Sequence, residues 1–256
     1  MTMKKTKKNY SITSTDEAIS IIENEKNAFP VEAVEYLLNE DRDQRIIKKA
    51  HYHVSNFNNE KLYYYEKSKY GPYTPLCFLI LADKHHDESL IEPCINLYTE
   101  PDSDDYDAIY DQGSLLLILL CRNYPDIAIP KIFDAIDKAS DTDVEAPLTY
   151  LSTVFFYAHK GKYKKRILQI LSKDEFYDYA ALAFEAANLQ IKEVIPILKN
   201  KLDKIKNKKF HEVNQGVYQT MADALLILET GELDFESPDD AYERLRDWRR
   251  WVRFLD

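Results

Sequence analysis

Proline recurs in the sequence between aliphatic residues, at intervals that match the length of a helical hairpin. Pro93, Pro130 and Pro196 stand in such settings, and the intervals between them are 37 and 66 residues. The longer interval equals two repeat lengths of about 33 residues, with Lys165-Arg166-Ile167-Leu168 in the intermediate place. Proline fits the first turn of a helix because its missing N–H would have no partner there. The pattern therefore predicts a row of antiparallel helix pairs, with each proline at the start of a second helix.

Helical periodicity dominates the rest of the chain. Apolar residues return at three- and four-residue steps, as in Val194, Ile195, Leu198 and Leu202. The chain has only 5 glycines, too few for the turns of an all-β fold. The sequence predicts helices over residues 15–25, 30–40, 42–57, 72–84, 88–99, 106–123, 127–138, 145–159, 162–172, 176–188, 192–206, 213–230 and 238–254.

Several of the predicted helices are apolar on every side, among them residues 115–121, 151–158 and 179–187. A helix of this kind must be covered on both sides. We therefore expect an all-α fold, a right-handed α-α superhelix in which antiparallel helix pairs stack into a solenoid. In this prediction residues 14–256 form a single domain behind a flexible tail at 1–13. The domain comprises an N-terminal cap at 14–69, regular repeats at 70–205 and a C-terminal cap at 206–256.

The aliphatic-Pro-x-aliphatic helix starts at 90–97, 127–133 and 193–198 resemble those of HEAT-like repeats of the phycobilisome-lyase type. A narrower resemblance, to the bacterial DUF1186-like family of unknown function, rests on residues 70–73, 97–102 and 177–182. The chain departs from the usual Gly-Asp turn of these repeats, as at His85-His86-Asp87. The resemblance implies a HEAT-like solenoid, which belongs to the armadillo-like folds.

The charge of the chain is acidic overall and unevenly distributed. A formal net charge of -10 disfavours nucleic acid as a partner, because phosphate binding depends on Lys and Arg. Acidic residues gather in the loop between two predicted helices at residues 100–111, and such loops often carry function. We expect this loop and nearby tyrosines to bind another protein with a basic surface. The predicted partner-binding residues are Asp102, Asp104, Asp105, Asp107, Tyr110, Tyr70 and Tyr73.

The expected function is that of a non-enzymatic scaffold or adaptor that binds its partner on the concave inner face of the solenoid and on the acidic loop. One specific form would be an immunity-like inhibitor of a basic toxin. The sequence has no glycine-rich phosphate loop and no nucleophile elbow. We therefore expect neither an enzyme nor a bound cofactor.

The candidate metal ligands do not form a recognisable site. His85, His86, Asp87 and Glu88 are consecutive, so their side chains point in different directions. The three cysteines, Cys77, Cys94 and Cys121, lie in apolar stretches without CxxC spacing and are expected to be buried free thiols. The sequence predicts no metal site.

The alternative function is that of a HEAT-like enzyme. Deoxyhypusine hydroxylases of this class hold two irons with repeated His-Glu pairs, and here only His211-Glu212 has that order. HEAT-like alkylpurine DNA glycosylases hold DNA on a basic concave face with aromatic residues. The basic runs at 162–166 and 199–209, with Trp248 and Trp251, are the residues that could serve in this way.

The last predicted helix carries an apolar face that could bind a partner or dock on the chain itself. We expect it to dock on the last hairpin of the chain through Leu245, Trp248, Val252 and Leu255.

The sequence predicts a cytoplasmic protein that does not enter a membrane. The lysine-rich start is followed by a polar stretch without the apolar core of an export signal. The longest apolar run, Leu115–Cys121, is 7 residues, whereas a bilayer-spanning helix needs about 20.

Overall fold

The computed structural model describes residues 11–63, 67–98, 107–138, 154–159, 161–173, 179–207, 215–231 and 236–249. Every regular element among these residues is a helix, which confirms the predicted all-α class. The α-helices are α1 (Thr15–Asn24), α2 (Val31–Asn39), α3 (Gln44–Ser55), α4 (Glu60–Tyr63), α5 (Thr74–Lys84), α6 (Ile91–Asn96), α7 (Asp107–Asn123), α8 (Pro125–Lys138), α10 (Val154–Ala158), α11 (Lys164–Ser172), α12 (Tyr179–Asn188), α13 (Ile195–Asn207), α14 (Gln215–Thr230) and α15 (Pro238–Leu245). Two 3-10 helices, η1 (Glu88–Leu90) and η2 (Lys192–Val194), precede α6 and α13.

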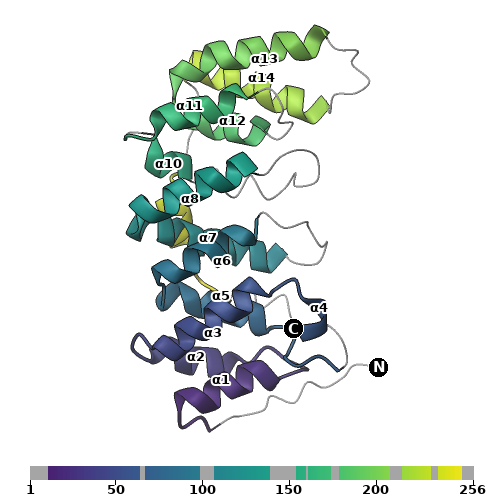
Figure 1. Ribbon diagram of the computed structural model, residues 1–256, viewed down its shortest axis with the longest axis vertical. Coiled ribbons are helices and arrows are strands. Elements are labelled where there is room, and N and C mark those ends of the chain that lie inside the picture. Colours follow the sequence, from purple (N-terminus) through teal and green to yellow (C-terminus); the bar gives the residue numbers. More distant parts are fainter. Residues whose placement is uncertain are drawn as a thin grey trace.

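The helices stack in chain order along the long axis of the molecule (Figure 1), with α1 and α2 at one end and α13 and α14 at the other. In one layer α5 contacts α7, and α7 contacts α10. In the second layer α3 contacts α6, and α6 contacts α8. Helix α7 also packs across the layers against α6 and α8. Most contacts therefore join elements that are close in the sequence.

Local capping fixes several helix starts. The Ser14 hydroxyl accepts a hydrogen bond from the backbone N–H of Glu17 at the start of α1. The Asp43 carboxylate does the same for Arg45 at the start of α3. Each cap satisfies a backbone donor that has no partner within the helix.

The recurring prolines mark two of the three helix starts. Pro93 and Pro196 lie in the first turn of α6 and α13, each just after a 3-10 turn. Pro130 instead lies inside α8, which begins at Pro125 rather than near residue 127. The prediction was wrong here because a second proline occupies the first helical position, where its missing N–H costs nothing.

One hydrophobic core extends along the stack from α1 to α14. In α5 all residues from Thr74 to Ala82 are buried, so the helix is covered on every side. Helices α6 and α7 approach closely at Gly113, where an added Cβ atom would lie 2.6 Å from Cδ1 of Leu97. The stack is thus packed through its interior.

The C-terminal segment departs from the prediction. Helix α15 ends at Leu245 rather than near residue 254, and among the described residues it packs on α7 instead of α14. Trp248 stacks on Phe29, at the opposite end of the stack from α14. Figure 1 shows the yellow C-terminal residues behind α7 and α8. The prediction was wrong because the apolar surface that this segment covers comes from helices far earlier in the sequence.

Candidate functional site

Helix ends from three successive pairs lie along one edge of the stack (Figure 1). The second helix of each pair ends there, and the first helix of the next pair starts there, because antiparallel helices reverse direction at each connection. The ends are those of α6, α8 and α11, and the starts are those of α7 and α12. The segments that follow α6, α8 and α11 therefore leave the described helices at this edge.

The predicted acidic site belongs to the first of these connections. Asp102, Asp104 and Asp105 lie outside the described residues. Asp107 is the first residue of α7, and its side chain also lies outside the described part of the chain. The structure thus places the helix ends that flank the predicted site.

The three predicted tyrosines lie mainly in the core. Tyr70 is 8% exposed and packs edge-on against His53, with the ring centroids 4.8 Å apart. Tyr110 is 7% exposed and packs against Phe57. Tyr73 alone is half-buried. The expected surface of three aromatic rings does not form, since Tyr70 and Tyr110 fill space between helices.

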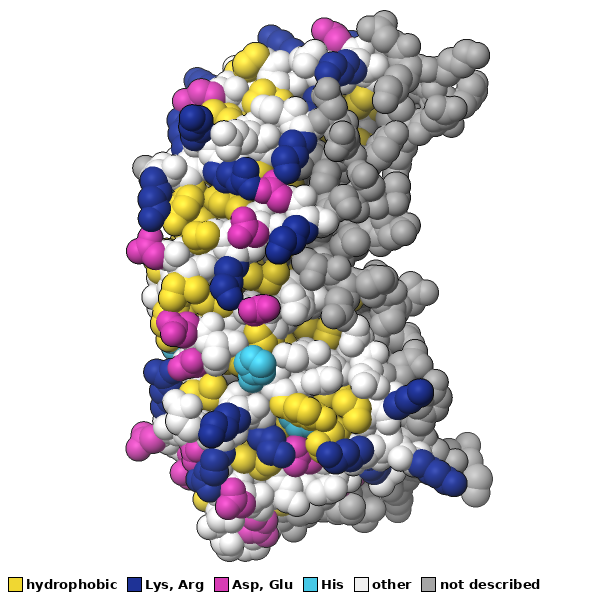
Figure 2. All heavy atoms as spheres, in the orientation of Figure 1, with side chains coloured by type: hydrophobic (Ala, Val, Ile, Leu, Met, Phe, Trp, Pro, Cys, Tyr) yellow, Lys and Arg dark blue, Asp and Glu magenta, His cyan; other side chains and the backbone are white. Residues whose placement is uncertain are grey.

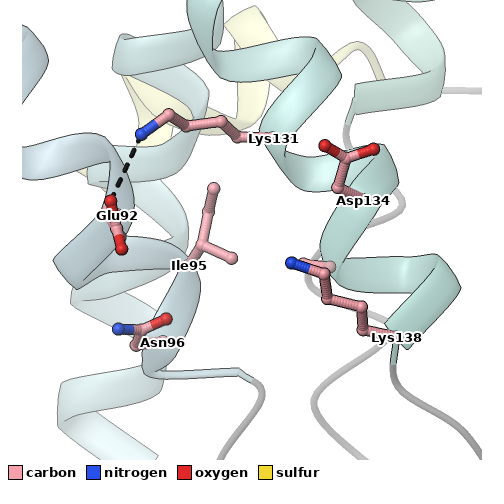
Figure 3. A pocket seen from close by; sticks show the side chains of 7 residues that line it. Glu92, Ile95, Asn96, Lys131, Asp134 and Lys138 are labelled. Carbon is pink, nitrogen blue, oxygen red and sulfur yellow. Dashed lines mark hydrogen bonds and ion pairs between the residues drawn. The ribbon is translucent and has the colours of Figure 1, made fainter.

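A groove lies between α6 and α8 and reaches the ends of both helices (Figure 3). It has a volume of about 420 Å³ and is lined by Glu92, Ile95, Asn96, Lys131, Asp134, Ala135 and Lys138. Nζ of Lys131 lies 3.3 Å from Oε2 of Glu92 across the groove. Both charge signs surround an apolar floor at Ile95, an arrangement that suits a polypeptide segment better than a small apolar ligand.

Ion pairs join successive helices across the face seen in Figure 2, where basic and acidic side chains are interspersed. Nζ of Lys162 lies 3.0 Å from Oδ1 of Asp126, and the Asp137 carboxylate pairs with both Arg166 and Lys173. Further pairs are Lys164 with Glu193 and Lys199 with Glu229. Many charges in the basic runs are therefore balanced within the chain, which counts against the DNA-glycosylase alternative.

A buried polar cluster surrounds His53 near the first helices. Nε2 of the ring lies 2.8 Å from Oε1 of Glu23, and Nδ1 lies 3.0 Å from the Tyr63 hydroxyl. Lys49 donates to the same Glu23 oxygen at 2.6 Å. The His53 ring stacks on Phe78, with an interplanar angle of 10°.

The electrostatics of this cluster favour a neutral ring. Burial lowers the pKa of His53, and the nearby Glu23 carboxylate offsets this only in part. Burial alone would raise the pKa of Glu23, but the hydrogen bonds from His53 and Lys49 outweigh it and hold this pKa below 4.5. We infer that Nε2 donates to Glu23 and that Nδ1 accepts from Tyr63. His53 is fully buried and Tyr63 is only 1% exposed, and the cluster stabilises the packing of α1, α3 and α5.

The histidines that were considered as candidate metal ligands point to different partners. Nε2 of His85 is 3.1 Å from the carbonyl oxygen of Leu37, whereas Nε2 of His86 is 3.0 Å from the side-chain nitrogen of Asn123. Within the described ranges, no three His, Cys, Asp or Glu side chains are placed to hold a metal ion.

The cysteines are buried free thiols, as predicted. Burial raises the pKa of Cys77, Cys94 and Cys121 above 9.0. The thiols therefore stay protonated at neutral pH and are poor nucleophiles and poor metal ligands.

A second surface, which the sequence predictions missed, lies on the layer that contains α5, α7 and α10. Residues 236–249, which we call the C-terminal strap, lie against it. The strap covers the side chains of Leu115, Ile118 and Leu119, which form a stripe on α7. Leu115, Ile118 and Leu119 are three and four residues apart and so lie on one face of α7. This spacing was the sequence signal for a further apolar face that needs a cover.

No family model, curated protein or solved structure matches this chain. A proposal about function must therefore rest on the surfaces of the chain itself.

The described helices include none that is both long and apolar enough to cross a bilayer. The longest described helix is α7, and it packs against α5, α6 and α8.

Proposed function

We propose that this chain is a HEAT-like right-handed α-α superhelix that acts as a non-enzymatic protein-binding scaffold, and that its partner presents a basic surface. The observation that carries the proposal is the charge of three successive segments between helices. Residues 99–106, 139–153 and 174–178 contain four, three and three acidic residues, and none of these segments contains Lys or Arg. We call these three segments the acidic edge. The next one, residues 208–214 between α13 and α14, contains Lys208 and Lys209 and does not share this charge.

The first segment of the acidic edge overlaps the predicted acidic loop at 100–111, and the other two segments repeat its acidic character. The ends of α6, α8 and α11, after which these segments begin, lie along one edge, and like charges that follow one edge would add to a common field. A row of like charge attracts a partner of opposite charge and speeds its association, more at low than at high salt. The mixed-charge groove between α6 and α8 opens beside this edge and can receive a segment of the bound protein.

The test compares two variants that remove the same charge from opposite edges. Asp104→Asn with Asp105→Asn neutralises part of the acidic edge. Asp41→Asn with Glu88→Gln neutralises exposed residues near the turns within helix pairs. Each immobilised chain is exposed to native cell lysate at low and high salt, and the retained proteins are quantified.

We expect the wild type and the Asp41/Glu88 variant to retain the same basic protein in a salt-sensitive way, and the Asp104/Asp105 variant to lose it. Equal retention by all three chains would contradict the proposal. Duplex DNA serves as a second probe, and selective binding of DNA with release of an alkylated base would support the glycosylase alternative instead.

A further inference from the structure

The C-terminal strap covers an apolar stripe that is separate from the main core. Leu115, Ile118 and Leu119 of α7 form a small cluster with Tyr242 of α15, and Leu245 packs against it. Under α15 the strap therefore rests on a cluster that is distinct from the core running through the stack, whereas Trp248, further along the strap, packs into that core.

Polar contacts fix the direction of the strap on this surface. The Tyr157 hydroxyl donates to Oδ1 of Asp239 at 3.0 Å, and the Arg122 guanidinium lies 3.6 Å from the same oxygen. The Arg122 guanidinium also lies 5.0 Å from the centroid of the Tyr242 ring. The Tyr242 hydroxyl donates to Oδ2 of Asp83 at 3.1 Å. The surface thus binds a carboxylate in the first turn of the docked helix, that of Asp239, and a tyrosine one turn later, Tyr242.

The strap reaches beyond α15 to the first helices. The Trp248 ring lies 5.9 Å from the Phe29 ring. Nη2 of Arg249 lies 3.1 Å from Oε1 of Glu35, and both side chains are exposed. At the other end of the strap, Asp239 pairs with Arg122 of α7. Ion pairs therefore join the strap to the stack near both of its ends.

The docked strap leaves one group in an unfavourable state. Oδ1 of Asp83 is buried and has no hydrogen-bond partner, and burial raises the pKa of this carboxyl. Leaving one oxygen of a buried carboxylate unsatisfied costs free energy, and the Tyr242 hydroxyl of the strap satisfies only the other oxygen. The chain between α14 and α15 begins at Gly231, which adopts a positive φ of 75° in open space. A turn at Gly231 thus precedes the strap, and the surface under the strap keeps one polar atom without a hydrogen-bond partner, Oδ1 of Asp83.

We propose that the surface of α7 and α10 under the strap is a helix-binding site, and that the C-terminal strap is its displaceable intramolecular ligand. Covalent linkage holds the strap at high effective concentration, so a free helix competes poorly with it. When the strap is released, the site accepts a helix of the same chemistry from another protein. The inference concerns a different face from the acidic edge and does not depend on it.

The test uses the full chain and a labelled synthetic peptide of residues 236–249. Tyr242→Ala with Trp248→Ala removes the two aromatic anchors from the strap but leaves the site itself unchanged. A milder variant, Asp239→Asn, removes one carboxylate that bonds Tyr157 and pairs with Arg122. Leu226→Ala, an exposed position on α14, is the matched control. Circular dichroism checks that each variant is folded.

We expect the peptide to bind the Tyr242/Trp248 variant about tenfold or more tightly than the wild type or the Leu226→Ala chain, because only that variant leaves the site free. Asp239→Asn should lie between them, and a peptide that carries Tyr242→Ala should not bind. Equal peptide binding by the variants and the wild type would overturn the proposal. Undiminished binding of the peptide without its tyrosine would overturn it as well.

Discussion

The Trp248 ring stacks on the Phe29 ring, with the centroids 5.9 Å apart and an interplanar angle of 28°. This contact joins a residue near the end of the chain to the connection between α1 and α2. In a stack of helix pairs, most contacts are made between neighbouring pairs, so each pair is stabilised mainly by the pairs next to it. The Trp248–Phe29 contact instead ties the two sequence ends together.

Trp248→Ala should release the strap without unfolding the stack. Truncating a buried Trp costs about 3–5 kcal/mol in a core that cannot rearrange, and release of the strap would let this site open instead. We therefore expect backbone hydrogen exchange to rise about tenfold or more in residues 238–249. Exchange around Phe29 should rise less, and exchange in α12 should stay as it is. Mass spectrometry of exchanged peptides measures this, and a uniform rise along the chain would contradict local release.

Asp83→Asn should tighten the docking of the strap. Burial raises the pKa of Asp83, against the effects of Tyr242, His86, Arg246 and Arg122, which face it. A carboxyl with a raised pKa favours the docked state while it is protonated, and this contribution is lost as the pH rises from 3.8 through the raised pKa. A neutral amide avoids this loss and can still accept from the Tyr242 hydroxyl.

Tryptophan fluorescence measures the effect of Asp83→Asn, because Trp248 and Trp251 are the only tryptophans in the chain. In a Trp251→Phe background, acrylamide should quench Trp248 less in the Asp83→Asn chain than in its parent at neutral pH. Stronger quenching would show that the charged carboxylate stabilises the strap.

Much of the helical framework could be predicted from the sequence because its signals are local. The start of α1 at Thr15 and the end of α14 at Thr230 match the predicted positions, since capping and a period of 3.6 residues act within a few turns. Tyr70 and Tyr110 were misjudged for a related reason. A tyrosine between two helices and a tyrosine on a surface can have the same spacing, and only tertiary packing separates them.

The path of the C-terminal strap could not be predicted in this way. Leu115, Ile118 and Leu119 indicate that α7 needs a further cover, but many amphipathic segments could supply it. Tyr242 is held by a hydrogen bond to Asp83 and by the Arg122 guanidinium over its ring, and both residues are far from it in the sequence. The proposal of an acidic edge could not be made from the sequence for the same reason, because only tertiary packing brings the ends of α6, α8 and α11 to one edge.

His53→Gln should make the protein less sensitive to mild acid. The pKa of His53 is lowered by burial, so the unfolded chain binds a proton more readily than the folded one. The stabilising contribution of the neutral ring is therefore present above pH 6.5 and is lost as the pH falls from 6.5 towards the lowered pKa. Each unit of difference between the two pKa values is equivalent to about 1.4 kcal/mol.

Urea denaturation from neutral to mildly acidic pH checks this prediction for His53. The free energy of unfolding should fall with pH in the wild type and in His51→Gln, a matched change at an exposed position. It should fall less in His53→Gln. The same slope in all three chains would show that another group controls the acid sensitivity.

Gly71→Ala should destabilise the packing of the N-terminal helices. A Cβ atom at this position would lie 1.9 Å from the backbone oxygen of Glu25, and a backbone atom cannot move aside as a side-chain end can. The N–H of Gly71 also donates to the carbonyl oxygen of Glu23 at 2.9 Å, so a shift would strain this bond. Overpacking of this kind costs about 1–3 kcal/mol or more. Gly161→Ala is the control, because the nearest atom to its added Cβ would be 3.9 Å away. Thermal denaturation should show a clear fall in Tm for Gly71→Ala and almost none for Gly161→Ala, and equal values would mean that the α1–α2 connection can move to admit the methyl group.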